Sequence, residues 1–593
     1  MNPSTAGARV LLDELVRLGV RELVLCPGSR SAPLAYAAHE LDAAGRLRLH
    51  VRVDERSAAF LALGLAKTSR RPAAVVTTSG TAVANLHPAV LEAHHGAVPL
   101  LLLTADRPPE LRGVGANQAT VQPGVFGDTV RLALELETPA DPDRQAPAWR
   151  TAAARAVAAA TGAIGGAGTA GPVHLDLPYR DPLAPDDHPS GRGTGDRIAG
   201  RDHLDPLLAG HLDPALAGRP DGAPWVALPP PPGPLDGAGA PLAHDERTLV
   251  VIGELPTAEH RASALAWVDH HGAPVIAEPG PGTSRLVLPH GDRLLAATDW
   301  VREHLPSRIV VVGRPTLGRA VPVLTRTPNL RVEVVTSGEP GADGWADATH
   351  AAAAVHPFAA LRTDGEGQEP TPLAREWLAA GEAVAAALTP TGDDLDGPAV
   401  ARAVHEAVPD GAALFLGSSS VARDLGHGVA RVRDAVEVVT SRGLAGIDGC
   451  VSTAVGLALS RSGPTVAVLG DLTFLHDANG LLVGPDEPRP DLTIVVVDDD
   501  GGSIFTTLEY GALELAGPMR RLFTTPTGTD IEVLCAAHGV PATTATSAEQ
   551  LTALVARPSE GIRVVRVPVD GAARRAAGQQ AREAVVAALG RLD

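Results

Sequence analysis

Two acidic residues in the C-terminal third of the chain have the types and spacing of a metal site. Asp471 and Asp499 each follow a short apolar run, and a helix-like stretch separates the two runs. This pattern predicts neighbouring parallel strands, whose carboxyl ends place both carboxylates at one edge of a sheet. With the Gly501 carbonyl, water and phosphate oxygens they form a hard-oxygen site suited to Mg²⁺. A helix cap at Asp471 and a plain turn around Asp499 are the structural alternatives.

Three blocks of alternating apolar runs and alanine-rich stretches provide the elements that position such residues. The pattern predicts an α/β protein with three doubly wound parallel-sheet domains, at residues 1–185, 248–390 and 391–593. Residues 186–247 are rich in proline and glycine and are predicted to be a linker. Because ligands bind at the carboxyl ends of parallel strands, polar residues that follow the apolar runs are the candidates for function.

The first and third blocks resemble each other in spacing. Gly64 and Gly456 each precede a proline by eight residues, and a strand-like run follows in both cases. This alignment places Ser79 opposite Asp471 and indicates a duplicated domain on either side of a Rossmann-like middle domain. The alternative is the general similarity of all β-α-β units.

Composition and charge exclude several classes of protein. The 593 residues carry a net charge of −19, which argues against a general nucleic-acid or membrane-surface binder. Lys67 is the only lysine among 50 basic residues and lies in no P-loop motif. The three cysteines, Cys26, Cys450 and Cys535, are far apart, which argues against a disulfide framework and fits a reducing cytoplasm. No apolar stretch is long enough to span a bilayer.

Residues 470–499 resemble the motif of thiamine diphosphate enzymes. That motif consists of Gly-Asp-Gly, followed by an interval about as long as residues 473–498 here, and then Asn. Leu472 stands in place of the last glycine, and Asp499 stands in place of the asparagine. The resemblance implies that Asp471, Asp499 and the Gly501 carbonyl hold Mg²⁺, or Mn²⁺, on the cofactor diphosphate. An aspartate is an adequate oxygen ligand, so we expect metal binding to survive the second replacement.

Glu55 is the candidate catalytic residue that the same resemblance implies in the first block. It follows a strand-like run that ends in Asp54 and precedes a predicted helix. In thiamine enzymes a carboxylate at such a position hydrogen-bonds N1′ of the aminopyrimidine, which promotes loss of the C2 proton of the thiazolium. A surface ion pair of Glu55 with Arg52 or Arg56 is the alternative.

Six segments together resemble the 2-succinyl-5-enolpyruvyl-6-hydroxy-3-cyclohexene-1-carboxylate synthase family of menaquinone biosynthesis. Their joint order and spacing carry the resemblance, which covers most of the chain and is weakest at about residues 181–300. The enzymes of this family are thiamine diphosphate-dependent transferases. The resemblance therefore implies that the protein decarboxylates 2-oxoglutarate and adds the resulting succinic semialdehyde carbanion to isochorismate. The six segments are residues 26–34, 53–67, 78–86, 103–118, 441–449 and 470–482.

The resemblance to this family implies further site residues. Ile447 is expected to lie under the thiazolium and hold the cofactor in a bent conformation, with ordinary core packing as the alternative. Both substrates carry two carboxylates, so guanidiniums and neutral donors are expected to bind them. The implied cofactor contacts are Pro27, Gly28, Glu55, Ser79, Gly446, Ile447, Asp471, Leu472, Gly501, Gly502, Ile504 and Phe505. The implied substrate contacts are Arg30, Arg107, Asn117, Gln118, Arg319, Ser419, Arg423 and Arg442.

The resemblance also implies a homodimer or a dimer of dimers, with each site between the first domain of one subunit and the third domain of another. Two other functions are open at this point. One is another thiamine diphosphate-dependent 2-oxoacid decarboxylase or an acetolactate synthase-like carboligase, which the arginine set and the lack of a flavin motif disfavour. The other is an inactive relative that acts as a scaffold, which the retained Glu55, Asp471 and Asp499 disfavour.

Overall fold

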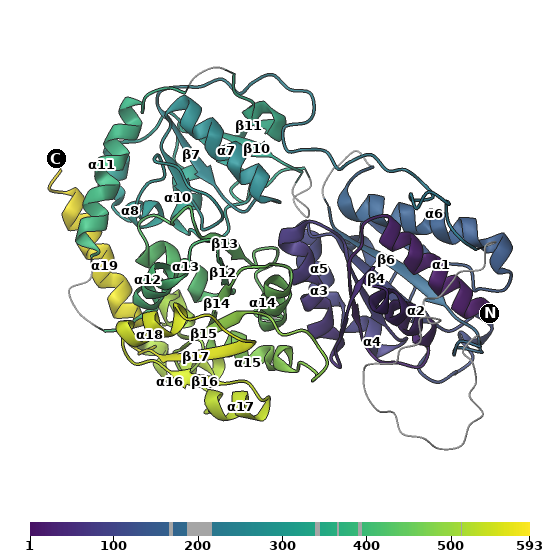
Figure 1. Ribbon diagram of the computed structural model, residues 1–593. Helices are drawn as coiled ribbons and strands as arrows, with labels where there is room; N and C mark the ends of the chain where they lie inside the picture. Colours follow the sequence, from purple (N-terminus) through teal and green to yellow (C-terminus); the bar gives the residue numbers. More distant parts are fainter. Residues whose placement is uncertain are drawn as a thin grey trace. The chain divides into compact units, whose positions relative to one another are not determined.

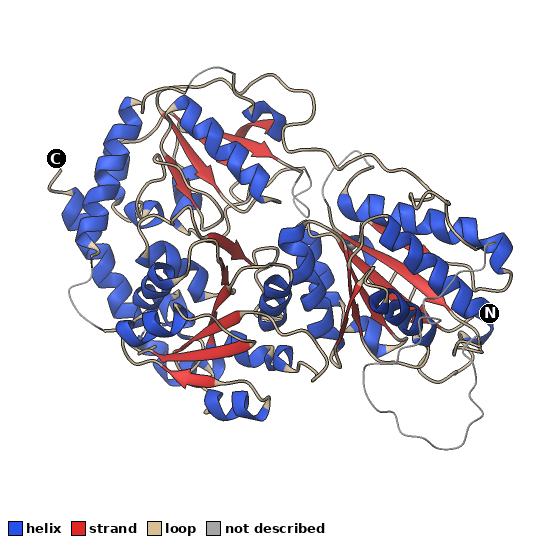
Figure 2. Ribbon diagram, viewed as in Figure 1, coloured by secondary structure: helices blue, strands red, loops and turns tan. Residues whose placement is uncertain are grey.

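Three sheets with only parallel strand pairing organise the chain in its computed structural model, which confirms the predicted α/β class (Figure 1). Figure 2 shows helices flanking the strands of each sheet. The chain divides into two compact units, residues 1–231 with 482–488, and residues 232–481 with 489–593. Within the described ranges, no helix is long and apolar enough to cross a membrane. The structure describes residues 1–164, 170–186, 216–338, 344–364, 367–389, 394–511 and 513–592.

The predicted linker at residues 186–247 lies in part outside the described residues, because 187–215 are not among them. From Leu216 to the start of the middle sheet at Thr248, the described part of this segment is built of turns and irregular chain, with no strand and no α-helix. This is the conformation that its proline and glycine content favours.

The first unit contains a six-stranded sheet in the order β2-β1-β3-β4-β6-β5. Every residue of its central strands β3, β4 and β6 is buried, as expected for a parallel sheet with helices on both faces. The strands are β1 (Glu22–Leu25), β2 (Arg48–Val51), β3 (Ala73–Thr77), β4 (Leu100–Asp106), β5 (Leu132–Glu135) and β6 (Pro172–Pro178). The helices are α1 (Pro3–Arg17), α2 (Ala32–Ala43), α3 (Glu55–Ser69), α4 (Thr81–Ala84), α5 (His87–His95) and α6 (Pro142–Thr161).

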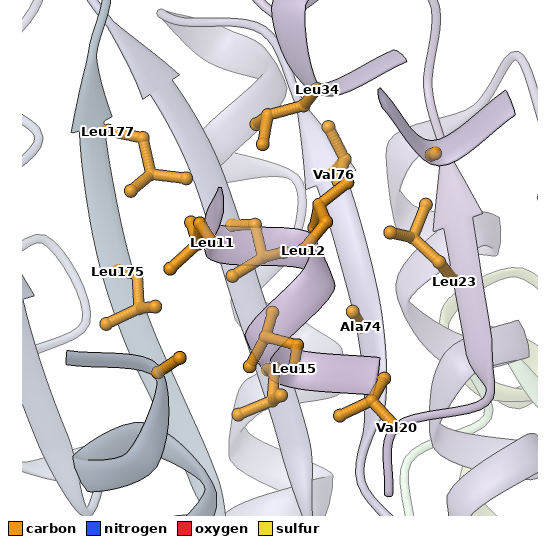
Figure 3. Packing of buried hydrophobic residues seen from close by; sticks show 14 of the residues in the cluster. Leu11, Leu12, Leu15, Val20, Leu23, Leu34, Ala74, Val76, Leu175 and Leu177 are labelled. Carbon is orange, nitrogen blue, oxygen red and sulfur yellow. The ribbon is translucent and has the colours of Figure 1, made fainter. Parts of the chain in front are cut away.

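Helix α1 illustrates how the sequence builds this unit. It begins after Asn2, whose side-chain oxygen accepts a hydrogen bond from the Thr5 amide at 2.9 Å. Figure 3 shows Leu11, Leu12 and Leu15 of this helix packed within the same apolar cluster as residues of the sheet. Each fully buried leucine contributes about 1.5–3 kcal/mol relative to an exposed one.

The third sheet has the order β13-β12-β14-β15-β17-β16, which is the same strand order as the first when each set is numbered from its own first strand. The strands are β12 (Ala413–Leu416), β13 (Glu437–Thr440), β14 (Thr465–Gly470), β15 (Leu492–Asp498), β16 (Ala542–Thr544) and β17 (Ile562–Pro568). The helices are α12 (Gly397–Ala407), α13 (Ser420–Gly428), α14 (Cys450–Leu459), α15 (Asp471–His476), α16 (Ala516–Met519), α17 (Ile531–Ala537), α18 (Ala548–Val555) and α19 (Arg574–Leu589).

The pairing register also relates the first and third sheets. Ala73, the first residue of β3, pairs with Glu22, the first residue of β1. Thr465, the first residue of β14, pairs in the same way with Ala413, the first residue of β12. Ser79 lies six residues beyond Ala73, and Asp471 lies six residues beyond Thr465. The predicted correspondence of Ser79 with Asp471 therefore agrees with the register of two sheets of the same topology.

The middle sheet has five strands in the order β11-β10-β9-β7-β8, the doubly wound order 2-1-3-4-5 when read from its other edge. Its apolar cluster includes Trp377 of α11 together with Val585 and Leu589 of the C-terminal helix α19. The strands are β7 (Thr248–Ile252), β8 (Val275–Ala277), β9 (Arg308–Val312), β10 (Arg331–Thr336) and β11 (Ala352–Pro357). The helices are α7 (Ala258–His271), α8 (Gly291–Leu294), α9 (Thr298–Glu303), α10 (Ala320–Thr325) and α11 (Pro372–Ala387).

Candidate active site

The carboxyl edge of the third sheet brings Asp471 and Asp499 together. Strands β14 and β15 are hydrogen-bonded neighbours, and Asp471 and Asp499 are the residues that directly follow them. One carboxylate oxygen of Asp471 accepts the Leu472 amide and the other accepts the Gly501 amide, each at 2.7 Å. Asp499 Oδ2 accepts the hydroxyl of Ser503. Asp499 Oδ1 is buried and has no hydrogen-bond partner among the described residues.

The electrostatics of this acid pair fit a bound dication. Burial and the nearby charge of Asp499 raise the pKa of Asp471 to about 7, and burial also raises the pKa of Asp499. A divalent cation would remove this repulsion and give the unpartnered Asp499 oxygen a ligand role. Within the part of the chain that the structure describes, no group of three or more His, Cys, Asp or Glu side chains could hold a metal. The two carboxylates and the Gly501 carbonyl would fill only part of the coordination shell of a metal ion, so water or phosphate oxygens could occupy its other positions.

The segment after Asp499 is packed too closely for larger residues. Gly501 has φ +128°, and an added Cβ would lie 2.0 Å from the Thr524 carbonyl oxygen. The Gly502 amide donates to that same oxygen at 2.7 Å. Ile504 and Phe505 follow in a half-buried 3₁₀ turn. These residues form a rigid glycine-rich turn beside the acid pair.

The predicted contacts near the thiazolium lie on two other segments of the third domain. Leu472 is half-buried on α15 beside Asp471. Gly446 is exposed and Ile447 is half-buried in the loop before α14, which Gly449 caps in the left-handed conformation (φ +66°). Ile447 is thus not a fully buried core residue, although its role stays a prediction.

Glu55 is the first residue of α3, at the carboxyl edge of the first sheet. The Asp54 side chain caps the helix by accepting the Ser57 amide at 3.1 Å. The Glu55 carboxylate is half-buried, and no other described residue forms a hydrogen bond or ion pair with it. Arg52 instead contacts Glu487 at 3.2 Å, so the alternative ion pair of Glu55 with Arg52 is not formed. The carboxylate is available to a ligand.

A buried arginine cluster lies at the same edge of the first sheet. Arg107 follows β4, and it donates to Ser79 Oγ at 3.1 Å and to the Asn117 carbonyl at 2.8 Å. The Ser79 hydroxyl donates to the Gln118 carbonyl at 2.7 Å, and the Gln118 side chain returns a bond to the Ser79 carbonyl at 3.0 Å. Burial and the positive charge of Arg30 lower the pKa of Arg107. Two neighbouring guanidiniums of this kind suit a carboxylate ligand.

Pro27 and Gly28 lie between β1 and α2 at this edge. An added Cβ on Gly28 would lie 2.3 Å from the Thr78 Cβ, so the chain here passes against the loop that carries Ser79. The Arg30 side chain donates to the Tyr179 carbonyl at 3.0 Å and approaches Asp181 at 3.7 Å. The predicted first-domain contacts therefore gather at adjacent strand ends.

A second arginine cluster lies within the other unit. Arg423 on α13 donates to the Ser419 carbonyl at 2.9 Å. Burial and the charges of Arg442 and Arg319 lower the pKa of Arg423, so the three charges lie within electrostatic range of one another. Arg442 is buried, whereas Arg319 is exposed before α10. Ser419 has φ +74° at the start of α13, an unusual conformation for a residue with a side chain. The four predicted residues are thus brought together.

A buried acid pair beneath the first arginine cluster was not predicted from the sequence. Asp106 ends β4 and Asp176 lies on the neighbouring β6, and Arg112 contacts them at 2.8 and 3.4 Å. Gln122 donates to Asp176 at 2.9 Å and accepts the amide of Gly80, the residue after Ser79, at 3.0 Å. The pair supports the loops that carry Ser79 and Arg107. Its signal in the sequence was only that each acid lies in or at the end of a strand-like run.

The pair makes the stability of the protein depend on pH. Burial and the charge of Asp106 raise the pKa of Asp176 to about 7. Since the unfolded value is about 3.9, the folded state binds more protons between these values, and stability falls as pH rises through this window. A single titrating group can change the free energy of unfolding by at most about 1.4 kcal/mol per pH unit. We expect Asp176→Asn to remove the contribution of this group and so to flatten the pH dependence. Urea unfolding of both proteins at several pH values from 5 to 7.5 tests this, and equal slopes would contradict the raised pKa of Asp176.

Comparisons with known proteins found a matching family model and relatives that cover nearly the whole chain. Residues 5–128 match the family model of the thiamine pyrophosphate enzyme, N-terminal TPP binding domain. The chain is 44% identical over 601 residues to the 2-succinyl-5-enolpyruvyl-6-hydroxy-3-cyclohexene-1-carboxylate synthase of Saccharopolyspora erythraea, with 99% of this chain and 100% of that one covered. It is 46% identical to the protein of that name from Kineococcus radiotolerans, with 96% of each chain covered. The corresponding Mycobacterium avium protein is 40% identical, with 99% and 100% covered.

One solved structure shows the fold alone. The benzoylformate decarboxylase from Polynucleobacter necessarius superposes with a TM-score of 0.61 over 96% of this chain and 99% of its own. The two chains are 18% identical, so this likeness concerns the arrangement of the sheets and helices.

Proposed function

The chain belongs to the 2-succinyl-5-enolpyruvyl-6-hydroxy-3-cyclohexene-1-carboxylate synthase family, and we propose that the residues at its sheet edges carry out that family's reaction. It is a thiamine diphosphate-dependent enzyme of menaquinone biosynthesis. It decarboxylates 2-oxoglutarate and joins the remaining four-carbon unit to isochorismate. Identities of 40% to 46% over nearly the whole chain carry this conclusion.

We assign the metal and the cofactor diphosphate to the third domain. Asp471, Asp499 and the Gly501 carbonyl are proposed to hold Mg²⁺, with Mn²⁺ as the second candidate. The like-charged acid pair and the unpartnered buried oxygen of Asp499 support this assignment. When bound, thiamine diphosphate supplies a carbon nucleophile that attacks the keto group of a 2-oxo acid and takes up the electron pair released with CO₂.

Glu55 is proposed to be the catalytic acid–base residue of the first domain. Its carboxyl group would share a proton with N1′ of the cofactor pyrimidine, which makes the neighbouring amino group basic. The support is its half-buried position at the start of α3, without a partner among the described residues. A residue in this role must keep its carboxylate free of permanent ion pairs.

The two arginine clusters are proposed to bind the substrate carboxylates. Guanidiniums bind carboxylates through paired hydrogen bonds, and burial strengthens the attraction. The first cluster provides Arg30 and Arg107 with the neutral donors Asn117 and Gln118. The second provides Arg319, Arg423 and Arg442 with Ser419.

The assembly and the compartment are proposals as well. We propose a homodimer or a dimer of dimers in which the first domain of one subunit completes the site on the third domain of another. We place the enzyme in the cytoplasm, because its three cysteines are buried and unpaired. Its net charge of −19 disfavours nucleic acid as a partner.

Product analysis tests the proposed function. The purified protein with thiamine diphosphate and Mg²⁺ is supplied with 2-oxoglutarate and isochorismate, or with pyruvate alone. We expect CO₂ and the six-membered-ring product only from the first pair. Turnover of pyruvate alone would favour a decarboxylase or an acetolactate synthase-like enzyme, and no turnover with any 2-oxo acid would favour an inactive relative.

A further inference from the structure

Glu278 lies where the middle sheet meets the second arginine cluster. It directly follows β8, at the carboxyl end of that strand. It lines a pocket that also includes Gly318, Asp292 and Arg423. The sequence around Glu278 is rich in glycine and proline and contains no motif that marks this residue as functional.

The Glu278 carboxylate holds one stretch of backbone. Its Oε1 accepts the amides of Thr316, Leu317 and Gly318 at 2.7, 2.5 and 3.4 Å. Three consecutive amides directed at one oxygen form an anion-binding nest, which here is occupied by a side chain of the same chain. The loop after β9 is therefore fixed by hydrogen bonds to one side chain and not only by packing.

The loop held by Glu278 in turn holds Arg442. The Arg442 guanidinium donates through Nη2 to the Thr316 carbonyl at 2.9 Å and through Nε to the Thr316 hydroxyl at 3.1 Å. Arg314, on the same loop, donates to the carbonyls of Arg442 and Gly443 at 2.9 and 3.0 Å. The chain of contacts runs from Glu278 through Thr316 to Arg442.

Charge provides a second link between Glu278 and the cluster. Arg423 is close to the positive charges of Arg442 and Arg319 and to the negative charges of Glu278 and Asp292. Guanidiniums within electrostatic range of one another repel, and a carboxylate beside them opposes that repulsion. One oxygen of the carboxylate accepts three amides and the other accepts the Thr316 hydroxyl at 3.4 Å, which together hold the carboxylate in place.

We propose that Glu278 is a positioning residue for substrate binding, which orients Arg442 through the 316–318 backbone and keeps Arg319 and Arg423 within one cluster. This role rests on the proposed function, since it presumes that these arginines bind substrate carboxylates. It adds an acidic residue from the middle domain, which already contributes Arg319 to the second arginine cluster. The substrate class it serves is a dicarboxylate.

Substitution of Glu278 tests the proposal through a separation of KM from kcat. Glu278→Gln keeps the size and one acceptor but removes the charge, and Glu278→Ala removes both. We expect the KM of at least one of 2-oxoglutarate and isochorismate to rise about 10-fold for the glutamine variant and more for the alanine variant. We expect kcat to change less than KM, and the affinity for thiamine diphosphate with Mg²⁺, measured by calorimetry, to stay within about 2-fold.

Two further variants keep the test decisive. Thr316→Val removes the hydroxyl acceptor of Arg442, and we expect it to raise the same KM to a smaller extent. Glu333→Gln is the matched control, because Glu333 is a buried acid of the same domain that pairs with Arg308 and Arg331. We expect this control to lower the melting temperature without raising either KM.

The outcomes separate the inference from the proposed function. A folded glutamine variant with both KM values unchanged would overturn the role of Glu278 even if the alanine variant does not fold. A wild-type protein that forms no product from 2-oxoglutarate and isochorismate would instead overturn the proposed function. A rise in KM that only follows a loss of cofactor affinity would also count against the positioning role.

Discussion

Glu55→Gln is expected to lower turnover by about 10²–10⁴-fold, the contribution that a well-placed acid–base group makes. The amide keeps the size of the side chain but cannot share a proton with the pyrimidine nitrogen in the same way. Because the proposed diphosphate and metal contacts lie on another domain, we expect thiamine diphosphate to bind with nearly its normal affinity. Steady-state assays with both substrates, together with calorimetry of cofactor binding, measure the two effects separately.

A control from the same unit distinguishes this effect from a general loss of a carboxylate. Glu40 pairs with Arg9 at 2.5 Å on helices of the same domain and has no predicted contact with a ligand. We expect Glu40→Gln to cost some stability and to leave turnover within about 2-fold. If Glu55→Gln lost cofactor affinity and turnover to the same extent, the acid–base role would be wrong.

Asp471→Ala is expected to weaken binding of the metal and of thiamine diphosphate together, and to remove most of the activity with them. The variant leaves Asp499 as the only carboxylate of the proposed site, and the backbone amides of Leu472 and Gly501 lose their acceptor. A lost direct ligand costs at least as much as a lost supporting contact, so we expect metal affinity to fall by about 100-fold or more. Titration of Mg²⁺ or Mn²⁺ into the protein with thiamine diphosphate measures this loss.

The neighbouring acid provides the control for Asp471. Asp498 ends β15, one residue before Asp499, but its side chain pairs with Arg566 at 2.6 Å. We expect Asp498→Asn to bind cofactor and metal within about 2-fold of the wild type, since a partly exposed ion pair contributes little. An Asp471→Ala variant that still binds both ligands would remove Asp471 from the metal site.

A mixture of the two inactive variants tests the proposed assembly. If each site combines the first domain of one subunit with the third domain of its partner, a heterodimer of Glu55→Gln and Asp471→Ala chains has one doubly damaged site and one intact site. Random pairing then restores about a quarter of wild-type activity. If each site instead belongs to a single chain, co-expression restores none.

The residues that follow strands could be predicted from the sequence. Apolar runs separated by helix-like stretches identify the strands, and consecutive strands of a β-α-β unit lie close in a parallel sheet. The order of the apolar runs predicts Asp471 beside Asp499, and the pairing of β14 with β15 agrees with this prediction. Local spacing also anticipated that the first and third sheets share a topology. The backbone rules that decide these features act over short stretches of chain, so a single sequence carries them.

The supporting contacts were decided by the tertiary structure. Asp106 and Asp176 are separated by 70 residues in sequence, and they meet because β6 pairs directly with β4. Glu278 reaches the amides of 316–318 because β8 and β9 both pair with β7, so their ends meet at one edge. Helix α19 belongs to the last block of the sequence, yet it packs beside α11 on the middle sheet (Figure 1). Strand order and register determine such long-range contacts, and both are set by packing of the whole sheet and not by any local pattern.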